Sequence, residues 1–245
     1  MEPRWIKIPF VGFTFQPSTL AGVILMIYVS RYLAKIKDIE IRFSKTILPL
    51  WIPTLLILLL ILPANFSTTA IIFCMVVLLC FVGGYPIKHL LGIIFSGILV
   101  LSIFILHIKA YPGIFPNRVD TWKSRIENFA NKENTTENYQ IEKAKIAIAT
   151  GGVRGLGPGK SVQKNFLPQS SSDFIFAIIV EELGIFGGMV LITLFVLLFI
   201  GIISITLDSF KKGRQFQGYT SFGIFLLISI QVLFNIEIIS ENDKL

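Results

Sequence analysis

The sequence alternates long apolar runs with short polar segments. The runs lie at about residues 19–33, 47–62, 68–82, 90–108, 174–207 and 219–239. Most are close in length to the roughly 20 residues that a helix needs to cross a hydrocarbon core about 30 Å thick, and the fifth is long enough to include an interfacial turn or a tilt. Lipid offers no partners to a free backbone, so each run must be a helix. We predict an all-α, polytopic membrane helix bundle with six transmembrane helices, forming one integral membrane domain over residues 1–245.

The composition agrees with a membrane protein. Hydrophobic residues make up 53% of the chain and charged residues 15%, and the mean hydropathy is +0.74, which is too apolar for a soluble domain of this size. The net charge of +7 does not indicate a nucleic-acid partner, because the cations lie between the apolar runs and form no basic, aromatic-interleaved groove. Cys74 and Cys80 share one apolar run, so we expect neither a disulfide nor a metal site there. We expect His89 and His107 to lie at the membrane interface.

The positions of the cations predict the orientation of the chain. Apart from those in the long loop at residues 109–173, most of the cations lie in the short loops after the first, third and fifth runs, namely Arg31, Lys35, Lys37, Arg42, Lys45, Lys88, Lys211, Lys212 and Arg214. Because short cytoplasmic loops are enriched in lysine and arginine, we place these loops inside the cell. Both termini and the long loop at residues 109–173 then face outward. In a bacterium this predicts a multi-pass protein of the inner (cytoplasmic) membrane with a periplasmic or extracytoplasmic loop.

The second part of the long loop has the pattern of an amphipathic helix. Over Tyr139–Ala149, the residues Ile141, Ala144, Ile148 and Ala149 share one helical face. We expect this helix to lie on the membrane or to pack over the bundle.

A glycine-rich segment follows, within residues 151–188, and leads into the fifth run. Its end, Gly159-Lys160-Ser161, is similar to a phosphate loop, but Arg154 stands where the first glycine of that motif belongs. We therefore exclude a nucleotide site. Two interpretations remain: the glycines let backbone N–H groups and nearby cations approach a diphosphate, or they only allow close packing of the backbone.

Acidic residues mark the start of the fifth run. Asp173 stands directly before it, and the pair Glu181 and Glu182 lies inside it. An ionisable group at the mouth of a membrane span is costly to place, so it indicates a functional site. Alternatively, Asp173 caps a helix, because Ser171-Ser172-Asp173 before an apolar run is typical of a capped start. One residue can serve both purposes.

Several segments together resemble one known family. Residues 151–188 read GGVRGLGPGKSVQKNFLPQSSSDFIFAIIVEELGIFGG, and PRWIKIPFVGFTFQPSTLA, PANFSTTA and Tyr139-Gln140 precede them in the same order as in that family. This resembles the SEDS family of FtsW, RodA and SpoVE, and it looks closest to the cell-division branch, FtsW. Members have about ten helices, and this chain is similar to the fourth to the ninth. We therefore expect it to be truncated at both ends.

The resemblance implies a function and a set of site residues. Family members are peptidoglycan glycosyltransferases that polymerise lipid II into glycan strands, and this branch acts in septal cell-wall synthesis beside a class B penicillin-binding protein and other divisome proteins. Asp173 matches the catalytic aspartate, which would act as general base. We expect a divalent cation, Mg²⁺ or Mn²⁺, to clamp the diphosphate, and we expect no other cofactor. The expected substrate-binding or supporting residues are Arg154, Lys160, Gln163, Lys164, Glu181 and Glu182.

Two other functions fit the same sequence. A lipid II flippase or transporter would use polar groups within the membrane in a similar way. A non-catalytic scaffold of the divisome would need neither activity. The residues alone do not separate these alternatives from the polymerase.

Overall fold

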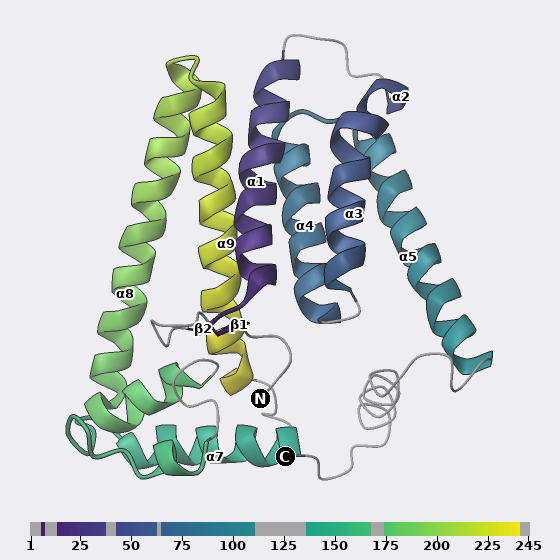
Figure 1. Ribbon diagram of the computed structural model, residues 1–245. Helices are drawn as coiled ribbons and strands as arrows, with labels where there is room; N and C mark the ends of the chain where they lie inside the picture. The colour runs from purple at the N-terminus through teal and green to yellow at the C-terminus, as the bar shows by residue number, and fades with distance from the viewer. Residues whose placement is uncertain are drawn as a thin grey trace. The chain divides into compact units, whose positions relative to one another are not determined.

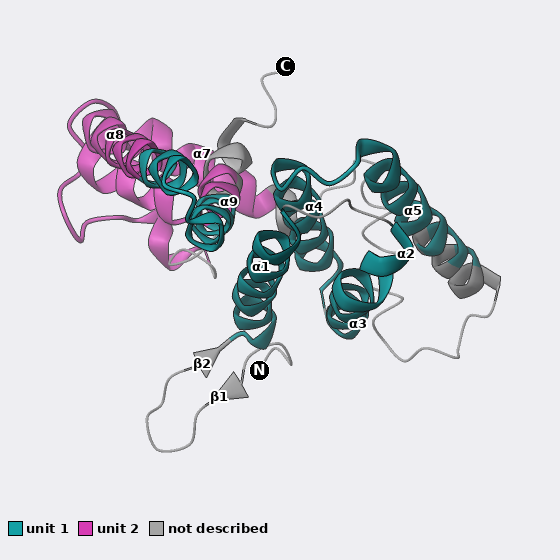
Figure 2. Ribbon diagram, turned by 90° about the horizontal axis from the view of Figure 1, so that it is seen from above, with its two compact units in different colours: residues 1–119, 202–227 teal, residues 120–201, 228–245 magenta. Residues whose placement is uncertain are grey.

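The computed structural model describes residues 6–7, 14–37, 43–62, 65–110, 136–167 and 174–240 (Figure 1). It is almost wholly helical, and its two short strands, β1 (Ile6–Lys7) and β2 (Thr14–Phe15), pair antiparallel. The chain divides into two compact units, residues 1–119 with 202–227 and residues 120–201 with 228–245 (Figure 2). Each unit is described separately below.

All six apolar runs are helical, which confirms the predicted fold class. Among the described residues, four helical stretches are long and apolar enough to cross a membrane, and two shorter apolar helices accompany them. The helix bounds are α1 Pro17–Ile36, α2 Phe43–Thr46, a π-helical turn at Ile47–Trp51, α3 Ile52–Ile61, α4 Phe66–Val82, α5 Ile87–Ala110, α8 Ile175–Lys211 and α9 Gln215–Ser240.

Local sequence explains where several helices begin. Pro17 opens α1, where its fixed φ suits the first helical turn and its missing N–H is not needed. Asn65 caps α4, since its side-chain oxygen accepts a hydrogen bond from the N–H of Thr68 at 3.3 Å. Between α2 and α3, Pro49 lies inside the π-helical turn, a wider turn that tolerates the loss of a regular helical hydrogen bond.

The first unit is built around α1, α3 and α4, which contact one another. The core includes Leu25, Val29 and Leu33 of α1, together with Val76 and Leu79 of α4, all of which are fully buried. Many apolar side chains on the outer faces are exposed, as expected of helices that face lipid.

A buried tyrosine joins two helices of this unit. Tyr85, which is 2% exposed, forms a hydrogen bond with the hydroxyl of Thr46, and its oxygen accepts the indole N–H of Trp51 at 3.1 Å. The Trp51 and Tyr85 rings also meet edge to face, with centroids 6.0 Å apart. Tyr85 lies between α4 and α5, so this arrangement ties the connection between those helices to α2 and the π-helical turn.

We expect Tyr85→Phe to lower the free energy of unfolding by about 1–3 kcal/mol, because it leaves the buried indole N–H of Trp51 without an acceptor. Thermal unfolding in detergent measures the change. Phe81→Leu is the control, since this ring is 55% exposed and its loss should change little. Equal stability of Tyr85→Phe and the unsubstituted protein would contradict the importance of this hydrogen bond.

The second unit contains the predicted amphipathic helix, α7, which runs over Thr136–Gly151 and so begins earlier than expected. It packs against the start of α8 through Ala144, Ala147 and Ile148. The predicted face is correct for Ala144 and Ile148 and wrong for Ala149, which is exposed. Ala149 lies about 100° around the helix from Ile148, whereas Ala147 lies three residues from Ala144 and shares its face.

We expect Ala144→Leu to destabilise this unit by about 1–3 kcal/mol, because its side chain has no exposed surface and a larger one overpacks the contact with α8. Ala149→Leu is the matched control, and it should stay within about 0.5 kcal/mol of the parent protein. Thermal unfolding of both variants in detergent distinguishes the observed face from the predicted one. A larger effect of Ala149→Leu would contradict the packing described here.

Helix α8 is interrupted near its start. Gly184 has φ 72° and ψ −178°, which is not helical, so the helix consists of a short segment before Gly184 and a long segment after it. The interfacial turn allowed for in the fifth run is therefore a break in the helix. In Figure 1 the short segment lies beside α7, and the long segment leads away from it. Glu181 and Glu182 sit at the end of the short segment.

Candidate functional site

The glycine-rich loop, residues 151–167, is bonded to α8 at its break. The carbonyl oxygen of Glu181 accepts the N–H of Leu156, and the carbonyl oxygen of Glu182 accepts the N–H of Gly157, both at 2.9 Å. In return, the N–H of Ile185 donates to the carbonyl oxygen of Gly152 at 2.9 Å. In a straight helix the N–H of Ile185 would bond to Glu181. The break therefore frees backbone groups that the loop satisfies.

Two glycines allow this close approach. A Cβ atom at Gly155 would lie 2.2 Å from the carbonyl oxygen of Glu182, and one at Gly184 would lie 2.2 Å from that of Val153. Both residues also have positive φ angles, 74° and 72°. Only glycine fits these positions, because the two backbones touch directly. The packing interpretation of the glycine segment is therefore correct for these residues.

The amide groups of the loop are largely used inside the protein. The N–H groups of Gly155, Leu156 and Gly157 bond to backbone carbonyl oxygens, and that of Lys160 donates to the carbonyl oxygen of Gly157 at 3.1 Å. These amides are not available to a phosphate group. If the loop binds an anion, its cationic side chains must supply most of the attraction.

The carboxylate of Glu181 is the centre of a second set of contacts. It is fully buried, and it accepts hydrogen bonds from the hydroxyl of Ser161 and from the N–H groups of Val162 and Gln163, the latter two at 3.1 and 3.3 Å. The N–H of Lys164 donates to the Ser161 oxygen at 3.1 Å. A buried carboxylate is costly unless donors surround it, and here the loop supplies them.

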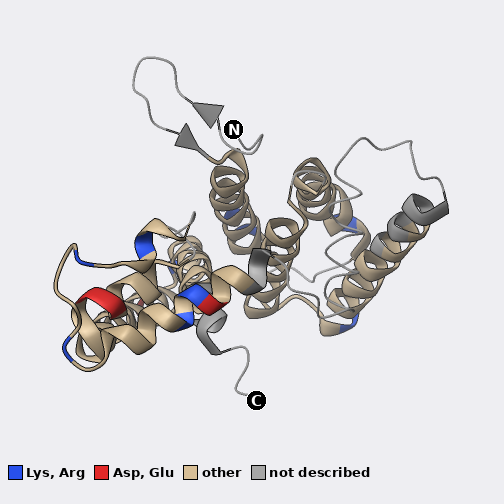
Figure 3. Cartoon of the chain, turned by 90° about the horizontal axis from the view of Figure 1, so that it is seen from below, with Lys and Arg blue, Asp and Glu red and all other residues tan. Residues whose placement is uncertain are grey.

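The structure brings most of the predicted binding residues onto this one loop. The side chains of Arg154, Lys160 and Lys164 are exposed and form no ion pair with any of the described residues. Figure 3 marks the lysine and arginine positions along the chain in blue. Gln163 is partly buried, and its side-chain oxygen has no hydrogen-bond partner within the described part of the chain. Glu182 is also partly buried. Among the described residues, nothing neutralises the positive charge on the surface of the loop.

Asp173 lies outside the described residues. The next residue, Phe174, is buried and packs with Leu167 of the loop and with α7. The predicted roles of Asp173, of the three cations, of Gln163 and of the two glutamates stay predictions.

Sequence reasoning missed the contact that holds the end of the loop to α7. The ammonium group of Lys143 lies 5.3 Å from the ring centre of Tyr139 and 5.5 Å from that of Phe166. Such cation–π contacts contribute about 0.5–1 kcal/mol at exposed sites. The spacing of Tyr139 and Lys143, four residues apart on a helix, was the only signal available, and it gave no hint of Phe166.

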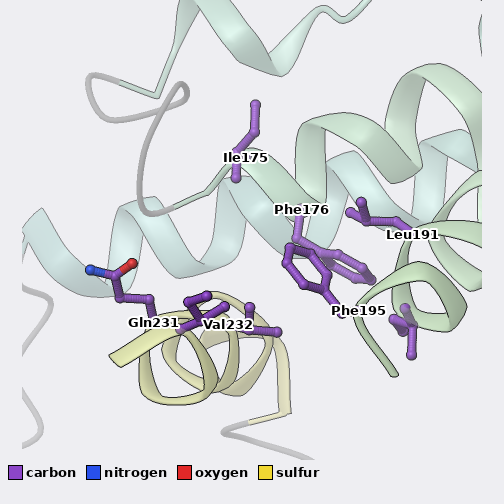
Figure 4. A pocket seen from close by; sticks show the side chains of 8 residues that line it. Ile175, Phe176, Leu191, Phe195, Gln231 and Val232 are labelled. Carbon is purple, nitrogen blue, oxygen red and sulfur yellow. The ribbon is translucent and has the colours of Figure 1, made fainter. Parts of the chain in front are cut away.

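An apolar pocket of about 230 Å³ lies in the same unit (Figure 4). Both segments of α8 and residues 228–232 of α9 contribute side chains to it. Its walls are formed mainly by Ile175, Phe176, Leu191, Phe195, Gln231 and Val232. The pocket begins two residues after Asp173 in the sequence. Gln231 is its polar wall, and all the other lining residues are apolar.

The described residues do not form a metal site. They contain no group of three or more histidine, cysteine, aspartate or glutamate side chains close enough to bind an ion. The buried carboxylate of Glu181 is already occupied by its three donors. The described residues alone therefore supply no site for the expected divalent cation, which stays a prediction, and no step of the mechanism is assigned to it.

The fold and the site define a class of protein: a multi-pass helical membrane protein with a cationic, glycine-rich loop bonded to a broken helix. The profile of the family described as Cell cycle protein (FtsW, RodA, SpoVE) matches residues 3–241. The chain belongs to this family.

Individual relatives are similar over nearly the whole chain. It is 33% identical over 238 residues to the probable peptidoglycan glycosyltransferase FtsW of Marinomonas mediterranea, covering 95% of this chain and 55% of that protein. It is 30% identical over 235 residues to the protein of the same name from Wigglesworthia glossinidia brevipalpis, covering 95% and 59%. The chain thus spans little more than half the length of these curated relatives.

Proposed function

We propose that this chain acts as a peptidoglycan glycosyltransferase that polymerises lipid II into glycan strands during septal cell-wall synthesis. The observation that carries the proposal is the similarity to FtsW proteins over 95% of the chain, which includes the entire cationic loop and the broken helix. The side chains of Arg154, Lys160 and Lys164 are exposed and form no ion pair with the residues that the structure describes, so they suit an anionic substrate group. A lipid-linked diphosphate carries such a group.

In this mechanism Asp173 is the general base. It takes the proton from the 4-hydroxyl of the acceptor sugar while that oxygen attacks carbon 1 of the growing chain. The new glycosidic bond forms as the bond from carbon 1 to the diphosphate oxygen breaks, with inversion at carbon 1, and undecaprenyl diphosphate leaves with the electron pair. The cations of the loop stabilise the negative charge that develops on the leaving group.

The proposed location follows from the distribution of the cations and from the substrate. We place the chain in the bacterial inner membrane, with the loop and Asp173 on the periplasmic side. The substrate must be activated before it reaches that side, because no nucleotide sugar is available there. A lipid-linked donor meets this requirement.

The proposed partners are a class B penicillin-binding protein and other divisome membrane proteins. A divalent cation, Mg²⁺ or Mn²⁺, would add charge neutralisation on the diphosphate when bound.

The test uses fluorescent lipid II and the purified chain in two formats. Polymer on a gel, formed in detergent, supports the proposed function. Movement of labelled lipid across the proteoliposome membrane, without polymer, would instead show that the chain is a transporter. If the chain binds a class B penicillin-binding protein but neither polymerises nor moves lipid II, it is a scaffold.

A further inference from the structure

We propose that Glu181 is a positioning residue, whose buried carboxylate clasps residues 161–163 to α8 and so holds Lys160 and Lys164 in place for a prenyl diphosphate. The identity of that ligand rests on the proposed function. The clasp itself rests on the hydrogen bonds to Glu181.

One residue holds both ends of the exposed tip of the loop. The carbonyl oxygen of Glu181 accepts the N–H of Leu156 at 2.9 Å, and its carboxylate accepts the N–H of Val162 at 3.1 Å together with the Ser161 hydroxyl. Between these two attachments lies a turn that the hydrogen bond from Lys160 N–H to Gly157 O closes at 3.1 Å. Lys160 therefore stands on a short turn with both ends fixed.

The second lysine is connected through Ser161. The Ser161 hydroxyl donates to the carboxylate of Glu181, and its oxygen accepts the N–H of Lys164 at 3.1 Å. Removal of this hydroxyl cuts both contacts at once. The side chains of Lys160 and Lys164 remain exposed, so the clasp orders their backbone without occupying their charges.

The buried charge of Glu181 is suited to this purpose. It is 0% exposed, and among the described residues no cation pairs with it. Hydrogen bonds to an ionised acceptor are about twice as strong as neutral ones, so a carboxylate holds the loop more firmly than an amide would. In Glu181→Gln the side-chain NH₂ would face donors, and the charge would be lost.

The first experiment measures the clasp directly. Amide hydrogen exchange of the intact protein in detergent is compared between the unsubstituted chain, Glu181→Gln and Ser161→Ala. We expect exchange at Val162 and Gln163 to rise at least about tenfold in Glu181→Gln, while the amides around Ala144 in α7 keep their protection and show that the unit is folded. Val162→Ala is the control, because its side chain is exposed and its N–H remains. Unchanged exchange at residues 162–163 would overturn the clasp.

The second experiment measures what the clasp does for the site. The dissociation constant for farnesyl diphosphate is determined for the same proteins and for Ser161→Thr, which keeps the hydroxyl. We expect about tenfold weaker binding in Glu181→Gln and Ser161→Ala, and restored binding in Ser161→Thr. Faster exchange with unchanged binding would overturn the positioning role. Neither hydrogen exchange nor ligand binding requires turnover. A chain that fails to polymerise lipid II would therefore refute the proposed function, and the two measurements would still test the clasp.

Discussion

Asp173→Asn is expected to abolish polymerisation of lipid II, with a loss of about 10²–10⁴ in kcat, because the amide cannot accept the proton of the attacking hydroxyl. Its binding of the donor should be nearly unchanged, since the cations of the loop remain in place. Gel analysis of the polymer under single-turnover conditions measures the chemical step, and a separate binding measurement tests the second expectation.

Two further variants separate catalysis from helix capping at this position. Asp173→Ser can still cap a helix, but it is not a general base, so it should keep the stability of the protein and lose the activity. Ser172→Ala alters the neighbouring residue and should keep both. If Asp173→Ser polymerises lipid II at the original rate, the residue is a cap and the proposed mechanism is wrong.

Gly184→Ala is expected to destabilise the second unit by about 2–5 kcal/mol and to release the loop from α8. The methyl group would lie 2.2 Å from the carbonyl oxygen of Val153, and the backbone conformation at φ 72° and ψ −178° is one that essentially only glycine adopts. Thermal unfolding in detergent measures the stability, and protease sensitivity at the loop measures the release.

Two other glycines serve as matched controls. A Cβ at Gly152 would meet no atom within 4 Å although its φ is positive at 52°, so Gly152→Ala isolates the cost of conformation, about 1–2 kcal/mol. Gly201 is helical and also has open space around it, so Gly201→Ala should be neutral or slightly stabilising. Equal effects of Gly184→Ala and Gly152→Ala would contradict the close contact between loop and helix.

The hydrophobic pattern predicted the six apolar helices because their length and composition depend only on the solvent in which they fold. It also indicated α7, through the spacing of Ala144 and Ile148. The pattern allowed for a turn in the fifth run but did not place it at Gly184, because that glycine lies inside a continuous apolar run and its conformation depends on contacts with residues about thirty positions earlier. Tertiary contacts of this kind leave little trace in local sequence.

The candidate site was predicted in part. The charged residues of the loop were predicted to form a site because placing cations and carboxylates beside a membrane span costs free energy, so such residues usually have a function. The sequence could not show that Glu181 faces Ser161 and Glu182 does not, since adjacent residues on a helix differ by about 100° in direction and either could have been buried. The contact of Lys143 with Phe166 likewise depends on the path of the loop.

The break in α8 leaves the backbone with two alternative ways to satisfy the same carbonyl groups. With the loop docked, the oxygens of Glu181 and Glu182 bond to Leu156 and Gly157. If the loop withdrew, the nearest substitutes would be the amides one helical turn further along, and the helix would straighten through Gly184. Undocking of the loop would therefore be coupled to straightening of α8, because the same two carbonyl groups cannot bond to both sets of amides.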